Sequence, residues 1–337
     1  MNFPLQIELT LRRLLTIRPI TQADMATGLI LMDISVVLAT FNRASSLQVT
    51  LESLLALVYP ASLSWELLVV DNNSTDLTRV NVEKFAAIAK FPVRYVFEGK
   101  QGRSAALNTG IVDAKGEIVA FTDDDVILHR DWLVNLNRTF DEFDCAAVAG
   151  RVLPQWSHSK PDWLEMNGHF AVVNFDLGDE IKEIKIPPLG ANSAFRKHVF
   201  KKHGLFRPDL GVTGSRHTIT CDDTEFGERL IRAGEKIVYC SNAIIYHPVD
   251  PRRTTKKYFL SWYYYNGISL TRMAGIPRES VIWLGAPRWL YREMLVNFAK
   301  WVLATKSKPR FHHKLQTYRS IGKIVESCRL SLNEAKH

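Results

Sequence analysis

The sequence lacks the features of several common protein classes. Its four cysteines, Cys145, Cys221, Cys240 and Cys328, are far apart and form no CxxC pair, which argues against a zinc knuckle and a disulfide framework. No apolar run reaches the roughly 18 residues of a membrane span. The amino end also lacks the basic start, apolar middle and small-residue cleavage site of a secretory signal. We therefore expect a protein of the reducing cytoplasm, either soluble or peripheral at the inner face of the cell membrane.

The positive charge of the chain favours anionic partners but does not identify a particular one. Its 337 residues carry 43 Lys and Arg against 35 Asp and Glu, a formal net charge of +8, which favours nucleotides, phosphates or acidic lipids as partners. No recognised nucleic-acid motif accompanies that charge, so we expect no nucleic-acid partner. No GxGxxG follows the first expected strand, which argues against a nicotinamide-dependent oxidoreductase.

Apolar runs of strand and helix period alternate along the first half of the chain. The strands expected from short β-branched or aromatic runs are residues 34–39, 65–70, 93–97 and 118–122. The helices expected between them are residues 46–57, about 76–90 and 104–114. This order predicts a mostly parallel sheet with helices on both faces. In such sheets ligands bind at the carboxyl ends of the strands, where Thr40, Asp71 and Asp123 fall.

Three consecutive aspartates, Asp123, Asp124 and Asp125, end the fourth of these strands. Carboxylates rarely gather at the tip of a buried strand without a cation to neutralise them. Mg²⁺ takes oxygen ligands, usually one or two carboxylates together with substrate phosphates, so the cluster predicts a metal site that binds a phosphorylated substrate. The alternative is a solvated turn or helix cap. Asp124 points to the opposite face if the strand persists, so we do not expect it to be the principal ligand.

Six segments together resemble the family 2 inverting glycosyltransferases of the GT-A fold, in order and in spacing. Single pieces of this kind are weak signals, but the set covers roughly residues 33–250. The segments are ISVVLATFNR at 34–43, LVVDNNSTD at 68–76, GRSAALNTG at 102–110, FTDDD at 121–125, GANSAFR at 190–196 and CDDTEFGERLIRAG at 221–234.

This resemblance implies a domain organisation. Residues 32–250 would form a Rossmann-like GT-A catalytic domain of the α/β class, with a nucleotide-binding half at about 32–130 and an acceptor half at about 131–250. Residues 1–31 would be an N-terminal extension, and residues 251–337 a basic, aromatic helical C-terminal region.

The resemblance also implies how a nucleotide donor would be held. Asp71 would accept hydrogen bonds from the base, while Thr40 and Arg43 would line the nucleotide pocket. Many relatives have arginine where this chain has Leu107, and Arg103 could supply that charge only by reaching in from elsewhere on its loop or helix. The donor-binding residues expected on this basis are Thr40, Arg43, Asp71, Asn108, Asp123, Asp124, Arg252 and Arg253.

For a divalent metal, Mn or Mg, the resemblance implies Asp123, Asp125 and His247 as ligands. A single histidine is more often structural, but imidazole suits Mn²⁺ and His247 falls where many relatives place a third ligand. Asp222 and Asp223 match the family's acidic motif at a helix start. An inverting transfer needs one base, and we expect Asp223 to be that base, with Asp222 as the second candidate. Alternatively, both carboxylates simply favour the positive end of the helix.

Several residues keep two interpretations. Asn108 would help to fix the donor, or would be an amide on the helix surface. Arg252 and Arg253 would neutralise the departing diphosphate, or would belong to a solvated basic loop. Asn192, in the small-residue segment that resembles the strand beneath the acceptor site, would lie near the donor sugar.

The acceptor half has fewer regular patterns. We expect a helix after Asp131, which can cap it, a strand at 146–152 and two short strands within 236–247. Aromatic side chains can stack on sugar faces, although most buried tryptophans are only core. The aromatics with these two interpretations are Trp156, Trp163 and Phe170.

The two ends of the chain depart from the family pattern. Residues 1–31 would be a loose extension or a short packed helix, and translation could start at Met32. Beyond residue 256, aromatics and leucines alternate with Lys and Arg. This pattern is too charged to cross a bilayer, but it suits either an amphipathic helix at an anionic membrane surface or a helical cap on the catalytic domain.

These observations together predict a metal-dependent inverting glycosyltransferase. It would move a sugar from a nucleoside diphosphate sugar, a UDP- or GDP-sugar, to a hydroxyl of a saccharide or lipid-linked saccharide. The alternative is a catalytically inactive protein that binds nucleotide sugars or interacts with a membrane surface. The carboxylates at 123, 125 and 223, together with His247, argue against that alternative.

Overall fold

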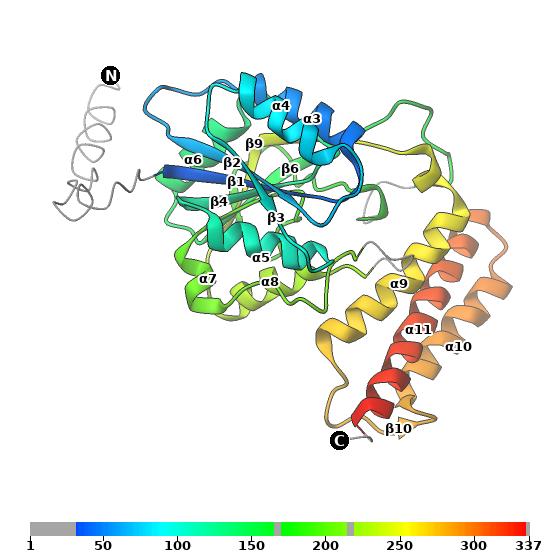
Figure 1. The fold of residues 1–337 in the computed structure, drawn as a ribbon. Coiled ribbons are helices and arrows are strands. Elements are labelled where there is room, and N and C mark those ends of the chain that lie inside the picture. Colours follow the sequence, from blue (N-terminus) through cyan, green and yellow to red (C-terminus); the bar gives the residue numbers. More distant parts are fainter. Residues whose placement is uncertain (1–31, 165–169, 214–218, 335–337) are drawn as a thin grey trace, which may run out of the picture. The chain divides into compact units, whose positions relative to one another are not determined.

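The computed structural model describes residues 32–164, 170–213 and 219–334, with the backbone alone at 170 and 333–334. Residues 1–31, for which the sequence suggested an extension and a start at Met32, lie outside these ranges. Within them, a nine-stranded sheet forms the centre of the molecule (Figure 1). Its first half is parallel because each strand is followed by a helix that returns the chain to the same edge.

The strand order follows from these crossovers. The parallel half is β3 (Val93–Phe97), β2 (Trp65–Asp71), β1 (Met32–Thr40) and β4 (Gly116–Thr122). The second half continues from β4 through β8 (Asn192–Arg196), β6 (Ala147–Gln155), β9 (Ile237–Pro248) and β5 (Ile127–Leu128), with β7 (Lys182–Ile184) also paired to β9. β8 runs antiparallel to both β4 and β6, and β6 and β9 are parallel.

Helices cover both faces of this sheet, as the alternating pattern predicted. Figure 1 shows α3 and α4 over one face and α5 and α8 over the other. Buried apolar residues of the strands and of the helices' inner sides form one continuous core. The helices of this part are α3 (Ala44–Leu55), α4 (Thr78–Ile88), α5 (Arg103–Asp113), α6 (Trp132–Glu142), α7 (His198–His203) and α8 (Asp222–Arg232), with a short 3-10 turn at Phe170–Val172.

Two local predictions were wrong. The two short strands expected within 236–247 are one continuous strand, β9, because the polar residues Ser241 and Asn242 are absorbed in a bulge between Cys240 and Ile244 rather than in a turn. Asp131 precedes α6 at the N-cap position, but its side chain accepts no capping hydrogen bond there.

Three long helices follow β9 and confirm the expected C-terminal helical region. A 3-10 turn, η2 (Pro251–Thr254), leads into α9 (Lys256–Ala274), whose start is capped by the Thr255 hydroxyl accepting from the Tyr258 amide. A hairpin of β10 (Ile282–Trp283) and β11 (Ala286–Pro287), then α10 (Arg288–Leu303) and α11 (Ser307–Glu334), complete the chain. None of the described helices combines the length and apolar character that a bilayer crossing requires.

Two glycines allow α9 and α11 to approach closely. A Cβ added at Gly267 would collide with the carbonyl oxygen of Arg319, and one added at Gly322 would collide with the carbonyl oxygen of Tyr264. Both obstacles are backbone atoms, which cannot move aside as a flexible side chain can. The crossing therefore requires glycine on each helix.

We predict that Gly267→Ala destabilises the protein by about 1–3 kcal/mol, the usual cost of overpacking. Where a helix has free space around the glycine, the same change stabilises the protein by up to about 1 kcal/mol. The sign of the change in the free energy of unfolding therefore shows whether the two helices touch at Gly267. Urea unfolding gives the free energy of unfolding. Gly99→Ala is the control, because its Cβ would make an ordinary contact at 3.5 Å with Phe97. A Gly267→Ala protein as stable as the parent would show that the helices do not cross this closely.

Candidate active site

The site lies where three strands of the sheet end. Thr40 ends β1 and is paired in register with Asp71, which ends β2. The aspartates at 123–125 follow β4, the neighbour of β1 on its other side. The parallel run of β1, β2 and β4 thus brings these polar tips to one edge, because parallel strands have their carboxyl ends on the same side.

Three side chains at this edge lie close enough together to hold a metal ion. Asp123, Asp125 and His247 each offer one ligand atom, and these atoms lie within 4.8 Å of one another. The Nε2 atom of the buried His247 is 3.4 Å from Oδ1 of Asp125. Its Nδ1 atom is 3.1 Å from the Pro248 carbonyl, which can only accept, so Nδ1 carries a proton there and Nε2 is the ring atom that faces the cluster.

The electrostatics of the cluster fit a divalent cation. Burial alone would raise the pKa of Asp125, but its hydrogen bond to His247 and the charges of His247, Arg43 and Arg253 hold that pKa below its usual value. Asp125 is therefore ionised at neutral pH and offers a charged oxygen to the cluster. Two carboxylates and one imidazole form a donor set suited to Mn²⁺ or Mg²⁺.

Asp124 turns away from this cluster. Its buried carboxylate accepts hydrogen bonds from the Thr40 hydroxyl at 2.7 Å and from the Arg43 guanidinium at 2.9 Å. Arg43 also donates to Asp125 at 2.8 Å. Burial raises the pKa of Asp124 to about 6. The hydrogen bonds among Thr40, Arg43, Asp124 and Asp125 therefore hold the tip of β1 to the turn after β4.

A second pair of carboxylates faces the cluster from the start of α8. Asp222 is buried, and its Oδ2 atom accepts from Nη1 of Arg103 at 2.6 Å. The Asp223 carboxylate accepts from the backbone amides of Gly190 at 2.8 Å and Thr224 at 2.6 Å. Burial and then the negative charge of Asp222 raise the pKa of Asp223. The two aspartates thus differ, since Asp222 is neutralised by an arginine and Asp223 is made more basic.

Arg103 links the two carboxylate groups. From the first turn of α5 its guanidinium donates to Asp222 through one nitrogen and to Oδ1 of Asp123 through the other, at 3.1 Å. Burial alone would lower the pKa of Arg103, but Asp222 and Asp123 hold it above its ordinary value. The guanidinium also fills the space beside Gly190, where a Cβ would lie 2.8 Å from Nη2 of Arg103.

The sequence only partly predicted the role of Arg103 as the cation between the two carboxylate groups. Leu107, where the resemblance led us to expect an arginine, is buried in the core, and the sequence offered Arg103 only as a substitute that would reach in from elsewhere. The signal that could have identified it is charge balance, because carboxylates at the β4 tip and at the α8 start need a cation between them.

The side chain of Asp71 already has two protein partners. Its carboxylate accepts from the Ser74 amide at 2.9 Å and from the Tyr95 hydroxyl at 2.7 Å. Burial and this hydrogen bond raise the pKa of Tyr95 to about 12. Recognition of a nucleotide base by Asp71 stays a prediction.

Two predicted asparagines have structural roles. The Asn108 amide donates to the Phe206 carbonyl at 2.9 Å and accepts from the Phe206 amide at 3.0 Å, which ties α5 to the segment after α7. The expected place of Asn192 near the donor sugar stays a prediction. Its side chain is fully buried, accepts from the Trp132 indole and donates to the Arg151 and Ala243 carbonyls, so it fixes the β9 bulge.

The two arginines of η2 also differ. The charge of Arg253 acts on both Asp125 and His247, so this side chain faces the metal cluster. Arg252 is largely exposed and its guanidinium pairs with Asp250 at 2.6 Å, which matches the alternative of a solvated loop.

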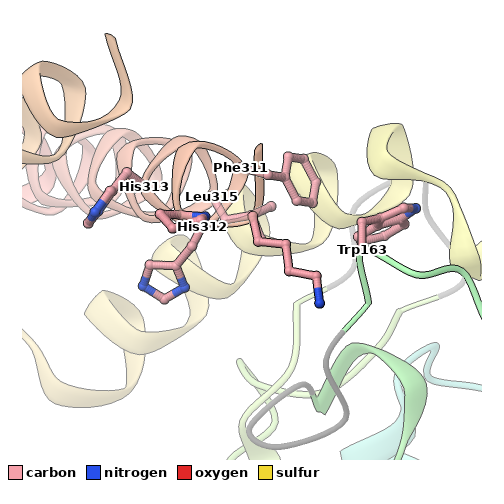
Figure 2. Close-up of a pocket in the computed structure, with 7 residues that line it drawn as sticks. Trp163, Phe311, His312, His313 and Leu315 are labelled. Carbon is pink, nitrogen blue, oxygen red and sulfur yellow. The ribbon is translucent and has the colours of Figure 1, made fainter. Parts of the chain in front are cut away.

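Of the aromatics considered for the acceptor, Trp163 lies in a separate pocket at the start of α11. This pocket has a volume of about 300 Å³ and includes none of the site carboxylates. Trp156 packs edge-on against His158 and joins an apolar cluster with Phe259, while the side chain of Phe170 lies outside the described part of the chain. Figure 2 shows the pocket, whose lining residues are Trp163, Lys308, Pro309, Phe311, His312, His313 and Leu315.

Comparison with known proteins agrees with this geometry. The family model "Glycosyl transferase family 2" matches residues 35–204. The glucosyl-dolichyl phosphate glucuronosyltransferase of Haloferax volcanii is 28% identical over 244 residues, which cover 71% of this chain and 76% of that protein. The O-antigen chain rhamnosyltransferase RfbN of Salmonella typhimurium is 25% identical over 288 residues, 80% of this chain and 88% of that protein.

Solved structures share the fold. The mannosyltransferase PcManGT from Pyrobaculum calidifontis, in complex with GDP-Man and Mn²⁺, has a TM-score of 0.54 at 20% identity, covering 91% of this chain and 75% of its own. S. aureus TarS 1-349 in complex with UDP-GlcNAc has a TM-score of 0.52 at 18% identity, covering 89% of this chain and 92% of its own. Because the family model spans half of the sequence, the chain belongs to glycosyl transferase family 2 and is a glycosyltransferase of the GT-A fold.

Proposed function

We propose that this glycosyltransferase moves one sugar from a UDP- or GDP-sugar, with inversion, to a hydroxyl of a saccharide or lipid-linked saccharide. The observation that carries the proposal is the pairing of the Asp123, Asp125 and His247 cluster with the Asp223 carboxylate, one on each side of Arg103. An inverting transfer needs these two functions, a group that holds the donor diphosphate and a base on the acceptor side.

The donor would be held at the cluster. Asp123, Asp125 and His247 would bind Mn²⁺ or Mg²⁺, which when bound neutralises the charge of the leaving diphosphate. Arg253 would add a positive charge on the same side. Support comes from PcManGT and TarS, whose structures contain GDP-Man with Mn²⁺ and UDP-GlcNAc. Residues 32–130 would bind the nucleotide and residues 131–250 the acceptor.

Asp223 would be the base. As the acceptor oxygen bonds to the anomeric carbon, the bond from that carbon to the diphosphate breaks on the opposite side and the hydroxyl proton passes to the Asp223 carboxylate. Asp222 suits this role less, because Arg103 neutralises it. The two backbone amides that donate to Asp223 hold it in place.

A lipid-linked acceptor fits the relatives. The Haloferax volcanii relative is by its name a glucosyl-dolichyl phosphate glucuronosyltransferase, so its acceptor is a sugar on a lipid phosphate. If this chain uses the same kind of acceptor, its reaction takes place at a membrane surface.

The test is a panel of UDP- and GDP-sugars assayed for nucleotide release with Mn²⁺, with Mg²⁺ and with EDTA. We expect release that requires metal and that falls by about 10²–10⁴-fold in Asp223→Asn, the range lost with a general base. Calorimetry with Mn²⁺ alone should show weaker binding by Asp125→Asn and unchanged binding by Asp223→Asn. Asp131→Asn, a change at an exposed carboxylate, is the control. Metal-independent release, or full activity of both site variants, would refute the proposed roles.

The raised pKa of Asp223 predicts a pH profile. The base must be ionised, so kcat should fall as the pH drops through the pKa of Asp223, which lies above the ordinary value for aspartate. Asp222→Asn removes the neighbouring negative charge that raises this pKa. The acidic limb of the profile should therefore move to lower pH in Asp222→Asn. An acidic limb that does not move in Asp222→Asn would assign that ionisation to another group.

The bridge made by Arg103 predicts a coupled effect on stability. Arg103→Met leaves Asp123 and Asp222 unpaired and should lower the free energy of unfolding by about 2–3 kcal/mol. This is less than for a fully buried pair, because the Arg103 side chain is 19% exposed. Adding Asp222→Asn should restore part of that loss. Arg79→Met, which breaks an exposed pair with Glu83, should change stability little. Equal effects at the two arginines would contradict the bridge.

A further inference from the structure

Helix α10 has an unusually exposed apolar surface. Of its 16 residues, all described, only Leu290 is buried. A helix in water normally gains its stability by burying its apolar side chains against the protein. On α10, by contrast, most of the apolar side chains are exposed to solvent. Its exposed apolar side chains, between 44% and 78% accessible, are Trp289, Leu295, Val296, Phe298, Val302 and Leu303.

Most of these side chains lie opposite the side that packs in the protein. Leu290 and Glu293 face inward, and the Glu293 carboxylate binds Ser320 and Lys323 of α11. α10 packs chiefly on α11, and Figure 1 shows it on the outer side of the C-terminal helices. We define the α10 outer face by the helical spacing of residues directed away from α11: Arg288, Arg292, Leu295, Val296, Phe298, Val302 and Leu303.

The preceding hairpin extends this surface. Val281, Ile282, Trp283 and Leu284 are between 47% and 70% accessible. The Trp283 ring packs edge-on against Tyr291 of α10, with the ring centroids 5.2 Å apart. The apolar surface therefore continues from the hairpin onto the helix.

The charges around this surface have one sign. Glu293 is the only acidic residue between 281 and 314, and it is engaged inward. Among the described residues, no acidic partner lies within ion-pair distance of Arg288, Arg292, Lys300 or Lys306. Other basic side chains in the same stretch are Lys308, Arg310 and Lys314.

We propose that the α10 outer face and the 281–284 hairpin dock on the surface of an anionic lipid bilayer. Exposed apolar side chains with a basic rim and tryptophans match the interfacial layer of such a membrane, where apolar groups enter and cations meet lipid phosphates. A second copy of the chain fits less well, because a two-fold contact through this face would bring its arginines together. The proposal does not depend on the sugar donor or the acceptor.

The test is flotation of the full chain with vesicles of phosphatidylglycerol mixed with phosphatidylcholine, and with vesicles of phosphatidylcholine alone. We expect binding to the anionic vesicles that weakens with salt. Leu295→Asp with Leu303→Asp should abolish it. Leu77→Asp with Ile88→Asp is the matched control, because those side chains are similarly exposed on the catalytic domain and should leave binding unchanged.

A second pair of variants isolates the charge. Arg288→Glu with Arg292→Glu should weaken binding to anionic vesicles by roughly tenfold or more. Lys84→Glu with Lys90→Glu, in and just after α4 of the catalytic domain, is the matched control and should leave binding unchanged. Two outcomes would overturn the proposal. They are a parent protein that does not bind anionic vesicles, and a parent protein that forms a dimer in light scattering which Leu295→Asp with Leu303→Asp dissociates.

Discussion

The arrangement of this site depends on how two arginines neutralise four of its five carboxylates. Arg103 joins Asp123 to Asp222, which is 119 positions from Arg103 in the sequence, and Arg43 joins the β1 tip to the turn after β4. Unpaired, these charges would repel one another in a region with little water to screen them. Each guanidinium binds carboxylates that the fold brings together. The ion pairs of Arg103 therefore form only when α5 and α8 are packed on the sheet.

That constraint explains the division of roles among the aspartates. The charge of Asp222 is balanced by an arginine, whereas burial and the neighbouring negative charge of Asp222 raise the pKa of Asp223. The Asp124 carboxylate is hydrogen-bonded to Thr40 and Arg43. Asp123 and Asp125 are therefore the carboxylates that lie beside His247. Neighbours in sequence thus acquire different chemistry from the partners that the tertiary structure supplies.

The sequence predicted those features that depend on local patterns. Alternating apolar periods predicted the parallel sheet, and the strand ends predicted where the polar tips meet. The antiparallel insertion of β8 between β4 and β6 has no local signal, because it is set by pairing across long separations. The buried hydrogen bonds of Asn192 have no local signal either, since the small residues around it suit both an open site and a tightly packed strand centre. Arg103 needed knowledge of which carboxylates meet.

The connection between β9 and the C-terminal helices joins the proposed membrane surface to the site. His247 nearly ends β9, η2 follows with Arg253, and α9 begins at Lys256. α9 is locked to α11 where Gly267 and Gly322 let the backbones touch, and α11 carries α10. A glycine contact of this kind leaves little freedom to slide. The direction of the α10 outer face relative to α9 is therefore fixed by packing, and α9 follows directly on η2 and Arg253.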